Sequence, residues 1–249
     1  MRTIAITNQK GGSGKTTTAV NLGACLAQLG KKVLLVDLDP QAHLTSSLGI
    51  KAHELEQAVY ELLKGEATLG EVLIARGKLR VIPSTIDLSG ADIKLSGVPG
   101  KEFLLKEALD KAKDFDYILI DCPPSLGLMT LNALTATREV FIPLQTEFLA
   151  LQGLSKLLET IKLVQKRLNK DLAIGGIVAT RFDRRKNLNR EVVAKIKDYF
   201  GDKVFDTLIR DNISLAEAPS YGQTIFEYAP RSYGAQDYLS LTKEVIRNG

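Results

Sequence analysis

The chain has 249 residues, 45% of them hydrophobic and 25% charged, which suits one large globular domain with a substantial core. Its 33 basic residues against 29 acidic ones give a net charge of only +4, so overall charge does not mark it as a nucleic-acid-binding protein. No apolar stretch approaches the length of a membrane span, and Cys25 and Cys122 are too far apart for a Cys-x-x-Cys site. We expect a single domain over residues 1–249, cytoplasmic and with free thiols.

The first predicted element is a buried strand at residues 3–7, which leads into a glycine-rich turn and a helix over residues 16–29. Glycines let successive backbone N–H groups point at one anion, and the helix adds the positive end of its dipole. The pattern predicts a phosphate-binding loop in which Lys15 contacts the β- and γ-phosphates and the Thr16 hydroxyl holds Mg²⁺. The nucleotide-binding residues expected here are Lys10, Gly11, Gly12, Ser13, Gly14, Lys15, Thr16 and Thr17.

This loop departs from the usual G-x-x-x-x-G-K-[ST] pattern, because Gln9 replaces the first glycine and a second lysine, Lys10, follows it. Two lysines that bracket Gly-Gly-Ser-Gly resemble the deviant Walker A motif of the ParA/MinD group of P-loop ATPases. The resemblance implies an ATPase with ATP and Mg²⁺ as cofactors. It also implies an ATP-dependent homodimer, in which Lys10 crosses to the partner's nucleotide and acts there as a catalytic residue alongside Lys15.

The next predicted strand lies within residues 32–41 and ends in two acids, Asp37 and Asp39. Asp39 is expected at the carboxyl end of a parallel strand, beside the phosphates, where a carboxylate orients and polarises the attacking water. Asp37 points to the same side of the strand. For Asp37 we leave open a catalytic role and a structural one, in which it holds the loop over residues 40–48. That loop is placed to respond to the γ-phosphate.

A third apolar strand, residues 115–120, ends in Asp121 and resembles a Walker B segment, which implies that Asp121 binds Mg²⁺ through water. The loop over residues 123–132 is a second nucleotide-responsive segment. Glu147, in a stretch that resembles a family motif near the dimer face, is either a contact of the partner's nucleotide or a surface acid. Further strands are expected at residues 79–83, 139–143, 173–180 and 203–205, with helices between them. This alternation predicts an α/β fold: a doubly wound, mostly parallel sheet flanked by helices.

Residues 181–190 carry five basic side chains against the single acid Asp183. Arginine and lysine bind the phosphate backbone without reading bases, so this run is a candidate site for nonspecific double-stranded DNA; a solvated loop and helix start is the alternative. Arg181 is a separate case, because in similar proteins this strand end lies near the adenine base, so it is also a nucleotide-binding candidate. The DNA-binding candidates are Arg184, Arg185, Lys186, Arg190 and Arg210.

Residues 211–222 resemble a stretch of chromosomal ParA (Soj) proteins that commonly reads P-R-N-V-R-L-S-E-A-P-S-H-G. The arginines of that pattern are Asp211 and Ser214 here, which leaves DNA binding open; Arg210 and Arg231 are candidates to compensate. Residues 235–249 carry a balanced set of charges and are expected to pack on the core as one helix. They do not resemble the basic amphipathic helix with which MinD-type relatives insert into membrane, so no membrane binding is expected.

We consider three alternative functions for this sequence. The first is a DNA-segregation ATPase, in which an ATP-induced sandwich dimer coats the nucleoid and a ParB/Spo0J-like DNA-binding protein stimulates hydrolysis. The second is a positioning ATPase that places a protein cargo, with weak or no DNA binding. The third is a redox enzyme related to the nitrogenase iron protein, which requires cluster cysteines at a dimer face; Cys25, on the first helix, is badly placed for that role.

Overall fold

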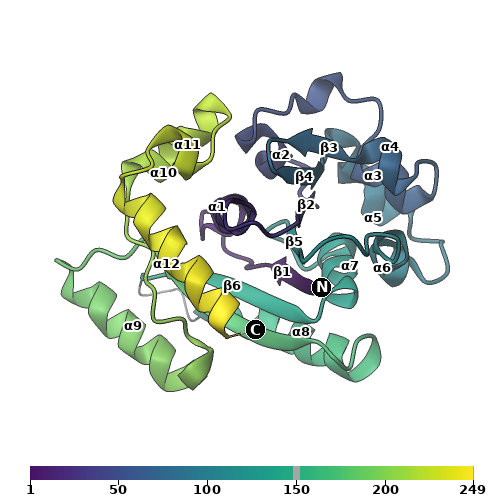
Figure 1. Cartoon of the computed structure of the whole chain (residues 1–249). Helices are drawn as coiled ribbons and strands as arrows, with labels where there is room; N and C mark the ends of the chain where they lie inside the picture. The colour runs from purple at the N-terminus through teal and green to yellow at the C-terminus, as the bar shows by residue number, and fades with distance from the viewer. Residues whose placement is uncertain (148–151, 249) are drawn as a thin grey trace.

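The computed structural model describes residues 1–147 and 152–248, and in these residues a seven-stranded sheet lies between two layers of helices (Figure 1). The strand order is β3-β4-β2-β5-β1-β6-β7, and neighbours run parallel except for the antiparallel pair β3 and β4. The expected doubly wound, mostly parallel sheet is confirmed. The strands are β1 (Arg2–Ile6), β2 (Val33–Asp37), β3 (Ile74–Arg76), β4 (Leu79–Ile82), β5 (Tyr117–Asp121), β6 (Glu139–Gln145) and β7 (Ala173–Thr180).

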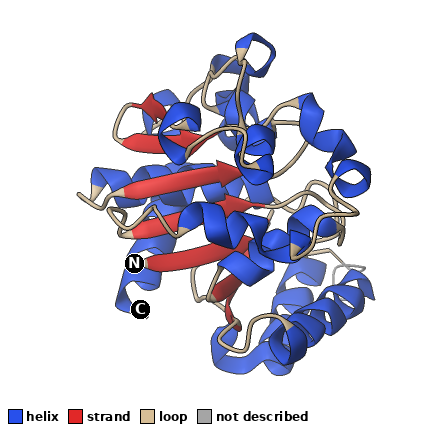
Figure 2. Ribbon diagram, turned by 90° about the vertical axis from the view of Figure 1, so that its right-hand side faces the viewer, coloured by secondary structure: helices blue, strands red, loops and turns tan. Residues whose placement is uncertain are grey.

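Helices follow most strands and cover both faces of the sheet, as Figure 2 shows with the strands stacked between them. The longer helices are α1 (Lys15–Gln28), α7 (Leu128–Ala136), α8 (Ser155–Arg167), α9 (Asn187–Phe200) and α12 (Tyr233–Arg247). The shorter α-helices are α2 (His43–Ser47), α3 (Val59–Lys64), α4 (Leu69–Val72), α5 (Ala91–Lys94), α6 (Leu104–Leu109), α10 (Ile213–Glu217) and α11 (Ile225–Tyr228). Short 3₁₀ turns are η1 (Ala52–Glu54), η2 (Ile86–Gly90), η3 (Lys101–Phe103), η4 (Gln152–Leu154), η5 (Gly201–Lys203) and η6 (Ala218–Tyr221).

The core consists of two apolar clusters, one on each face of the sheet. Side chains of α1 and α12 pack on one face, where Leu22 and Tyr238 are almost fully buried. Side chains of α3, α6, α7 and α8 pack on the other face, where Leu134 and Ile161 are buried in the same way. The central strands β2 and β5 are buried along their whole length, which explains their nearly unbroken apolar sequences.

The prediction of a strand at residues 203–205 is wrong. Residues Gly201–Lys203 form a 3₁₀ turn, and Val204 makes only an isolated parallel bridge with Ile177. The pairing stops because the next two N–H groups, of Asp206 and Thr207, donate to the carboxylate of Glu244 on α12, at 2.7 and 3.1 Å. The short edge strand β3, by contrast, was not predicted.

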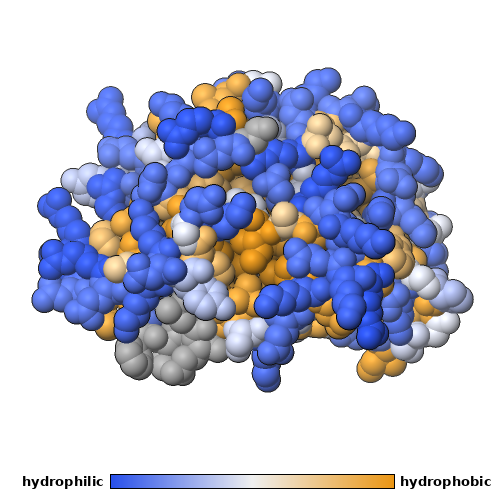
Figure 3. Space-filling model, turned by 90° about the horizontal axis from the view of Figure 1, so that it is seen from below, coloured by the Kyte–Doolittle hydropathy of each residue, from blue (hydrophilic) through white to orange (hydrophobic). Residues whose placement is uncertain are grey.

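The C-terminal helix packs on the core as expected, with Tyr238, Leu241 and Val245 of α12 buried. Figure 3 shows the face of the molecule that points downward in Figure 1. Hydrophilic side chains cover most of this face and surround a central apolar area. Within residues 1–147 and 152–248, no helix combines the length and apolar character that a membrane crossing needs.

Candidate nucleotide site

The turn between β1 and α1 has the backbone shape of a phosphate-binding loop. Gly12 and Gly14 have φ angles of +71° and +91°, in the left-handed region that favours glycine, and Gly14 is the N-cap of α1. Asn8 fixes the entry to the loop: its Oδ1 accepts from the N–H of Lys10 at 3.0 Å, and its Nδ2 donates to the carbonyl of Pro143 at 2.7 Å. The loop is therefore tied to β6 before it begins.

Two further strand ends hold the middle of the loop. The Nε2 of Gln145, the last residue of β6, donates to the Gly12 carbonyl at 2.6 Å. The Oγ1 of Thr180, the last residue of β7, donates to the Ser13 carbonyl at 2.9 Å. Neither residue was among the predicted site residues. Thr180 stands at the carboxyl end of a predicted parallel strand, the kind of position that singled out Asp39 and Asp121. Gln145, in contrast, lies two residues beyond the predicted strand 139–143, because β6 extends to Gln145.

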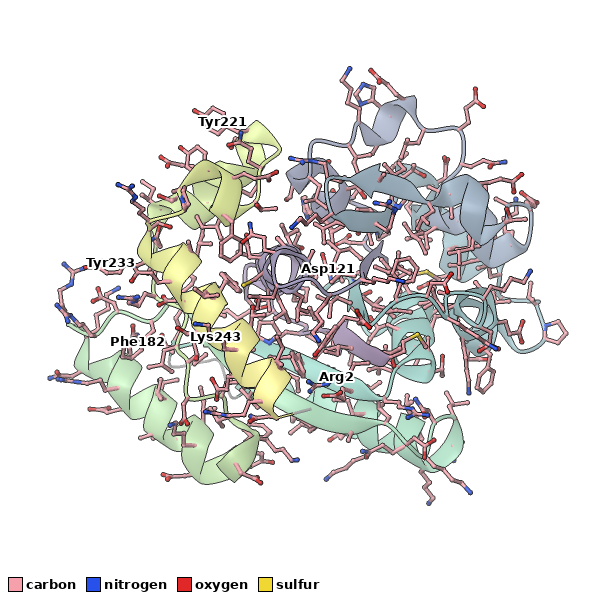
Figure 4. All side chains as sticks on the ribbon, in the orientation of Figure 1. Arg2, Asp121, Phe182, Tyr221, Tyr233 and Lys243 are labelled. Carbon is pink, nitrogen blue, oxygen red and sulfur yellow. The ribbon has the colours of Figure 1, made fainter. Side chains whose placement is uncertain are left out.

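Thr16 and Asp121 meet as expected at the start of α1. The Thr16 Oγ1 donates to Asp121 Oδ2 at 2.6 Å, and Asp121 is fully buried beside α1 (Figure 4). Its second oxygen, Oδ1, has no hydrogen-bond partner among the described residues. A hydroxyl and a carboxylate are oxygen ligands of the kind that Mg²⁺ takes, and the unpaired Oδ1 is an acceptor for a metal-bound water. These residues fit the magnesium ion that the sequence predicts.

Electrostatics at this position favour a cation. Burial raises the pKa of Asp121 well above its usual range, and the neighbouring Asp37 raises it further. Lys15 is also buried, with its Nζ 3.4 Å from the Lys10 carbonyl, and burial lowers its pKa against the attraction of Asp121. A divalent cation would favour the ionised form of Asp121, and phosphate charge would favour the ionised form of Lys15.

The two acids of β2 differ in their contacts. Asp37 is fully buried and accepts from the N–H and Oγ1 of Thr45 in α2, at 2.9 and 2.7 Å, and from the N–H of Asp39 at 3.1 Å. Burial raises the pKa of Asp37 to about 6, against the effect of these hydrogen bonds. The contacts favour the structural role for Asp37, because they hold residues 39–45 to the strand end.

Asp39 lines a cavity of about 430 Å³ together with the phosphate-binding loop. Its Oδ1 accepts from the Gln41 N–H at 2.9 Å. Lys15 and Thr16 line the same cavity, so the expected water-orienting carboxylate faces the space expected for the phosphates. His43 lines it too.

A second cavity, of about 310 Å³, adjoins the first and shares with it Gly12, Gly14 and Thr17. Its other walls are Thr180, Arg181, Ile209, Arg210, Asp211, Asn212, Leu215, Ala216 and Tyr238. Arg181 has a left-handed backbone with φ +53°, and its Nε lies 3.6 Å from Asp211 Oδ1. Arg181 is thus beside the loop, where the sequence predicts a nucleotide contact.

Lys10 is at the surface and is paired within its own chain. Its Nζ donates to Glu147 Oε2 at 2.7 Å, and the two side chains are 37% and 52% exposed. This hydrogen bond lowers the pKa of Glu147, and the nearby charges of Arg181 and Lys186 act in the same direction.

The DNA-binding candidates fall into two groups. Arg184, Arg185, Lys186 and Arg190 are all exposed, at the start of α9. Arg185 pairs with Asp183 at 2.9 Å. Arg210 instead donates to the buried carboxylate of Asp237, and its guanidinium lies 4.0 Å from the centre of the Tyr233 ring. Figure 4 labels Tyr233 at the start of α12. The charge of Arg210 is therefore balanced by an acid of its own chain.

Comparison with known proteins decides the family. A family model described as an AAA domain matches residues 1–174. The sporulation initiation inhibitor protein Soj of Bacillus subtilis is 55% identical over 249 residues, which cover 99% of this chain and 98% of that protein. The chain belongs to the Soj/ParA family of chromosome-partitioning ATPases. The chromosome-partitioning ATPase Soj of Treponema pallidum is 51% identical, over 98% of this chain and 97% of that protein.

A solved structure agrees with this assignment to a P-loop ATPase fold. The Mycobacterium smegmatis protein named cobyrinic acid a,c-diamide synthase, with bound ADP and magnesium, has a TM-score of 0.89 and 39% identity, covering 99% of this chain and 94% of that one. The predictions of a Soj/ParA-type ATPase and of ATP and Mg²⁺ as its cofactors are confirmed at the level of the family. Cys25 and Cys122 are both buried, so neither is exposed to hold a cluster at a dimer face.

Proposed function

We propose that this Soj/ParA ATPase segregates DNA. In this proposal ATP promotes a sandwich homodimer, the dimer binds nonspecific double-stranded DNA and so associates with the nucleoid, and a ParB/Spo0J-like partner stimulates hydrolysis and release. The observation that carries the proposal is the position of Lys10, an exposed cation beside the phosphate-binding loop of a chain whose relatives are named for chromosome partitioning. An exposed lysine there is free to act on the nucleotide of a second copy once it leaves Glu147.

The proposed roles follow from charge and geometry. Water attacks the γ-phosphorus in line, and the protein positions the reactants and neutralises the developing negative charge. Asp39 orients the water, Lys15 contacts the phosphates in cis and Lys10 contacts them in trans. Thr16, and Asp121 through water, would hold Mg²⁺, which would supply positive charge beside the phosphates. Arg181 contacts the base side of the nucleotide.

The proposed DNA surface consists of Arg184, Arg185, Lys186 and Arg190. All four are exposed on one loop and the first turn of a helix, so their charges lie close together. Such a cluster binds phosphates without base readout, and its affinity falls as salt rises. Arg210 lies next to this segment through a bridge with Phe182, but its pairing with Asp237 gives it a smaller part.

A titration of nonspecific duplex DNA with ATP, with ADP and without nucleotide, at two salt concentrations, tests the proposal. We expect binding with ATP only, weakened by salt. Arg184→Glu with Arg185→Glu should abolish it, whereas Lys111→Glu with Lys113→Glu, the same change of charge on exposed lysines after α6, should leave it within about twofold. Absence of DNA binding by an ATP-bound dimer would contradict the proposal.

A second candidate is a positioning ATPase that uses the same switch for a protein cargo. Asp211 and Ser214 stand where the chromosomal pattern has arginines, and Asp211 itself pairs with Arg181. These features lower the positive charge next to the second cavity. An ATP-dependent dimer that retains ATPase activity but binds no DNA would favour this candidate.

A further inference from the structure

Asn189 is a buried amide within an otherwise exposed basic segment. It lies in the first turn of α9 and is 5% exposed, while Leu188 and Arg190 on either side are exposed. Both ends of its side chain bond outside the helix. Its Nδ2 donates to the carbonyl of Thr146 at 2.5 Å, and its Oδ1 accepts from the N–H of Asp183 at 2.8 Å.

The Thr146 side of this bridge leads to the phosphate-binding loop. Thr146 follows Gln145, whose Nε2 holds the Gly12 carbonyl, and precedes Glu147, whose carboxylate holds Lys10. The N–H of Thr146 also donates to the carbonyl of Thr180 at 3.1 Å. Thr180 in turn holds the Ser13 carbonyl. Asn189 therefore bonds to Thr146, and the three residues next to Thr146, namely Gln145, Glu147 and Thr180, all contact the phosphate-binding loop.

The Asp183 side of the bridge leads to the exposed cations. The Asp183 carboxylate accepts from the backbone N–H and Nε of Arg185, each at 3.0 Å, and the Asp183 carbonyl accepts from the N–H of Lys186 at 3.0 Å. Arg185 lowers the pKa of Asp183 to about 2, so this carboxylate stays ionised near neutral pH. The position of Asp183 therefore sets the positions of Arg185 and of Lys186, the N-cap of α9.

We infer that Asn189 is a positioning residue that couples the nucleotide state of the phosphate-binding loop to the arrangement of the cations at residues 184–190. For its effect on DNA the inference rests on the proposed function. The two states are defined by Lys10, which is paired with Glu147 here and leaves that carboxylate when it contacts a nucleotide. The change displaces residues 145–147, and the rigid amide of Asn189 carries the displacement to Asp183 and Arg185.

The test compares Asn189→Ala and Asn189→Asp with Asn187→Ala, which removes an exposed amide two residues earlier that hydrogen-bonds to Arg190. Amide hydrogen exchange is followed by mass spectrometry with and without a non-hydrolysable ATP analogue and magnesium. In the unmodified chain and in Asn187→Ala, the analogue should slow exchange both in the loop and at residues 183–190. In both Asn189 variants the loop should still respond, and residues 183–190 should not.

A DNA titration supplies the second readout. The coupling factor is the DNA dissociation constant without the analogue divided by the constant with it. We expect this factor to fall at least tenfold in Asn189→Ala, with the affinity for the analogue unchanged. Asn189→Asp keeps an acceptor for the Asp183 N–H and loses the donor to Thr146, so an equal fall there assigns the effect to the strand contact.

Two results would overturn the inference. One is a loss of DNA affinity by the same factor with and without the analogue, because that result means that Asn189 only stabilises the basic segment and does not couple it to the nucleotide. The other is a response at residues 183–190 that survives both Asn189 variants or is missing from the unmodified chain. Failure of the proposed function looks different: the exchange response depends on Asn189, so the coupling holds, but the unmodified chain binds no DNA in any state.

Discussion

Lys10 and Glu147, 137 positions apart in the sequence, are joined by a hydrogen bond of 2.7 Å between Nζ and Oε2 of one chain. The lysine proposed to act on a partner's nucleotide is thus held by its own chain. Because both side chains are more than a third exposed, solvent screens the pair, and breaking it costs only about 0.2–1 kcal/mol. Contact with a triphosphate is therefore enough to draw Lys10 away.

Lys10→Ala is expected to separate nucleotide binding from turnover. Lys15 and the loop remain, so the affinity for ATP should stay within about threefold of the unmodified chain. The rate of hydrolysis should fall at least about 100-fold, because a cation at the transferring phosphoryl group is lost. Single-turnover kinetics and nucleotide titration measure the two quantities. Full activity in this variant would remove Lys10 from the catalytic residues.

Glu147→Gln is expected to favour the ATP-dependent dimer. The substitution removes the charge that holds Lys10, and the screened pair limits the effect to at most about fivefold in the dimer dissociation constant. Sedimentation with a non-hydrolysable analogue measures this constant, with Glu54→Gln, an exposed acid paired with Lys51, as the control. A weaker dimer would support the alternative, that Glu147 contacts the partner's nucleotide.

Asp39→Ala is expected to bind ATP and accumulate as a stalled dimer. Loss of the carboxylate that orients the water should lower the hydrolysis rate about 100- to 10,000-fold without weakening nucleotide binding. Rapid-quench kinetics and size-exclusion chromatography with ATP check the two parts. Hydrolysis at the unmodified rate would mean that another group on the cavity, such as His43, orients the water.

The sequence predicted those parts of the site that depend on local patterns. Asp121 ends the buried strand β5, and Asp39 follows the end of β2 by two residues. Parallel strands bring their carboxyl ends to one edge, so the two acids both lie beside the loop. The same rule applies to Gln145 and Thr180. Thr180 was overlooked because a hydroxyl at a strand end is less distinctive than a carboxylate, and Gln145 because the predicted strand stopped at residue 143.

Long-range pairings had no pattern to reveal them. Arg210 is 27 positions from Asp237, and only the packing of α12 against the end of the second cavity brings them together. The strand predicted at residues 203–205 fails to form for a similar reason, because the N–H groups that follow it donate to Glu244, which lies on α12. The sequence shows which residues are apolar or charged, but the hydrogen-bond and ion-pair partners that come from distant elements are known only from the three-dimensional arrangement.

Asp121→Asn is expected to weaken the response to magnesium. The variant keeps an oxygen beside Thr16 but loses the charge, so the Mg²⁺ concentration for half-maximal ATPase activity should rise at least about tenfold. Binding of ADP in the presence of a chelator should be unchanged, because that complex does not use the metal. A magnesium titration of the ATPase rate measures the first quantity, and calorimetry with ADP and a chelator measures the second. An unaltered magnesium dependence would remove Asp121 from the metal site.

Gly222→Ala is expected to destabilise the fold through a close contact between two loops. Gly222 has φ +63°, and an added Cβ would lie 2.6 Å from the Cα of Gly49, after α2. Gly65, with φ +74° and open space around its Cβ position, is the matched control. Gly65→Ala isolates backbone strain, about 1 kcal/mol, and Gly222→Ala should cost at least about 1 kcal/mol more because neither backbone can yield.

For a chain of this length, that difference lowers the melting temperature of Gly222→Ala by at least about 2 °C relative to Gly65→Ala. Calorimetry of the nucleotide-free chain measures it. Arg76 strengthens the same junction, since its guanidinium donates to the carbonyls of Leu48 and Gly222 and to Glu227. Equal melting temperatures for the two alanine variants would mean that the loops separate at no cost. The junction would then be too soft to fix residues 39–48 beside the nucleotide.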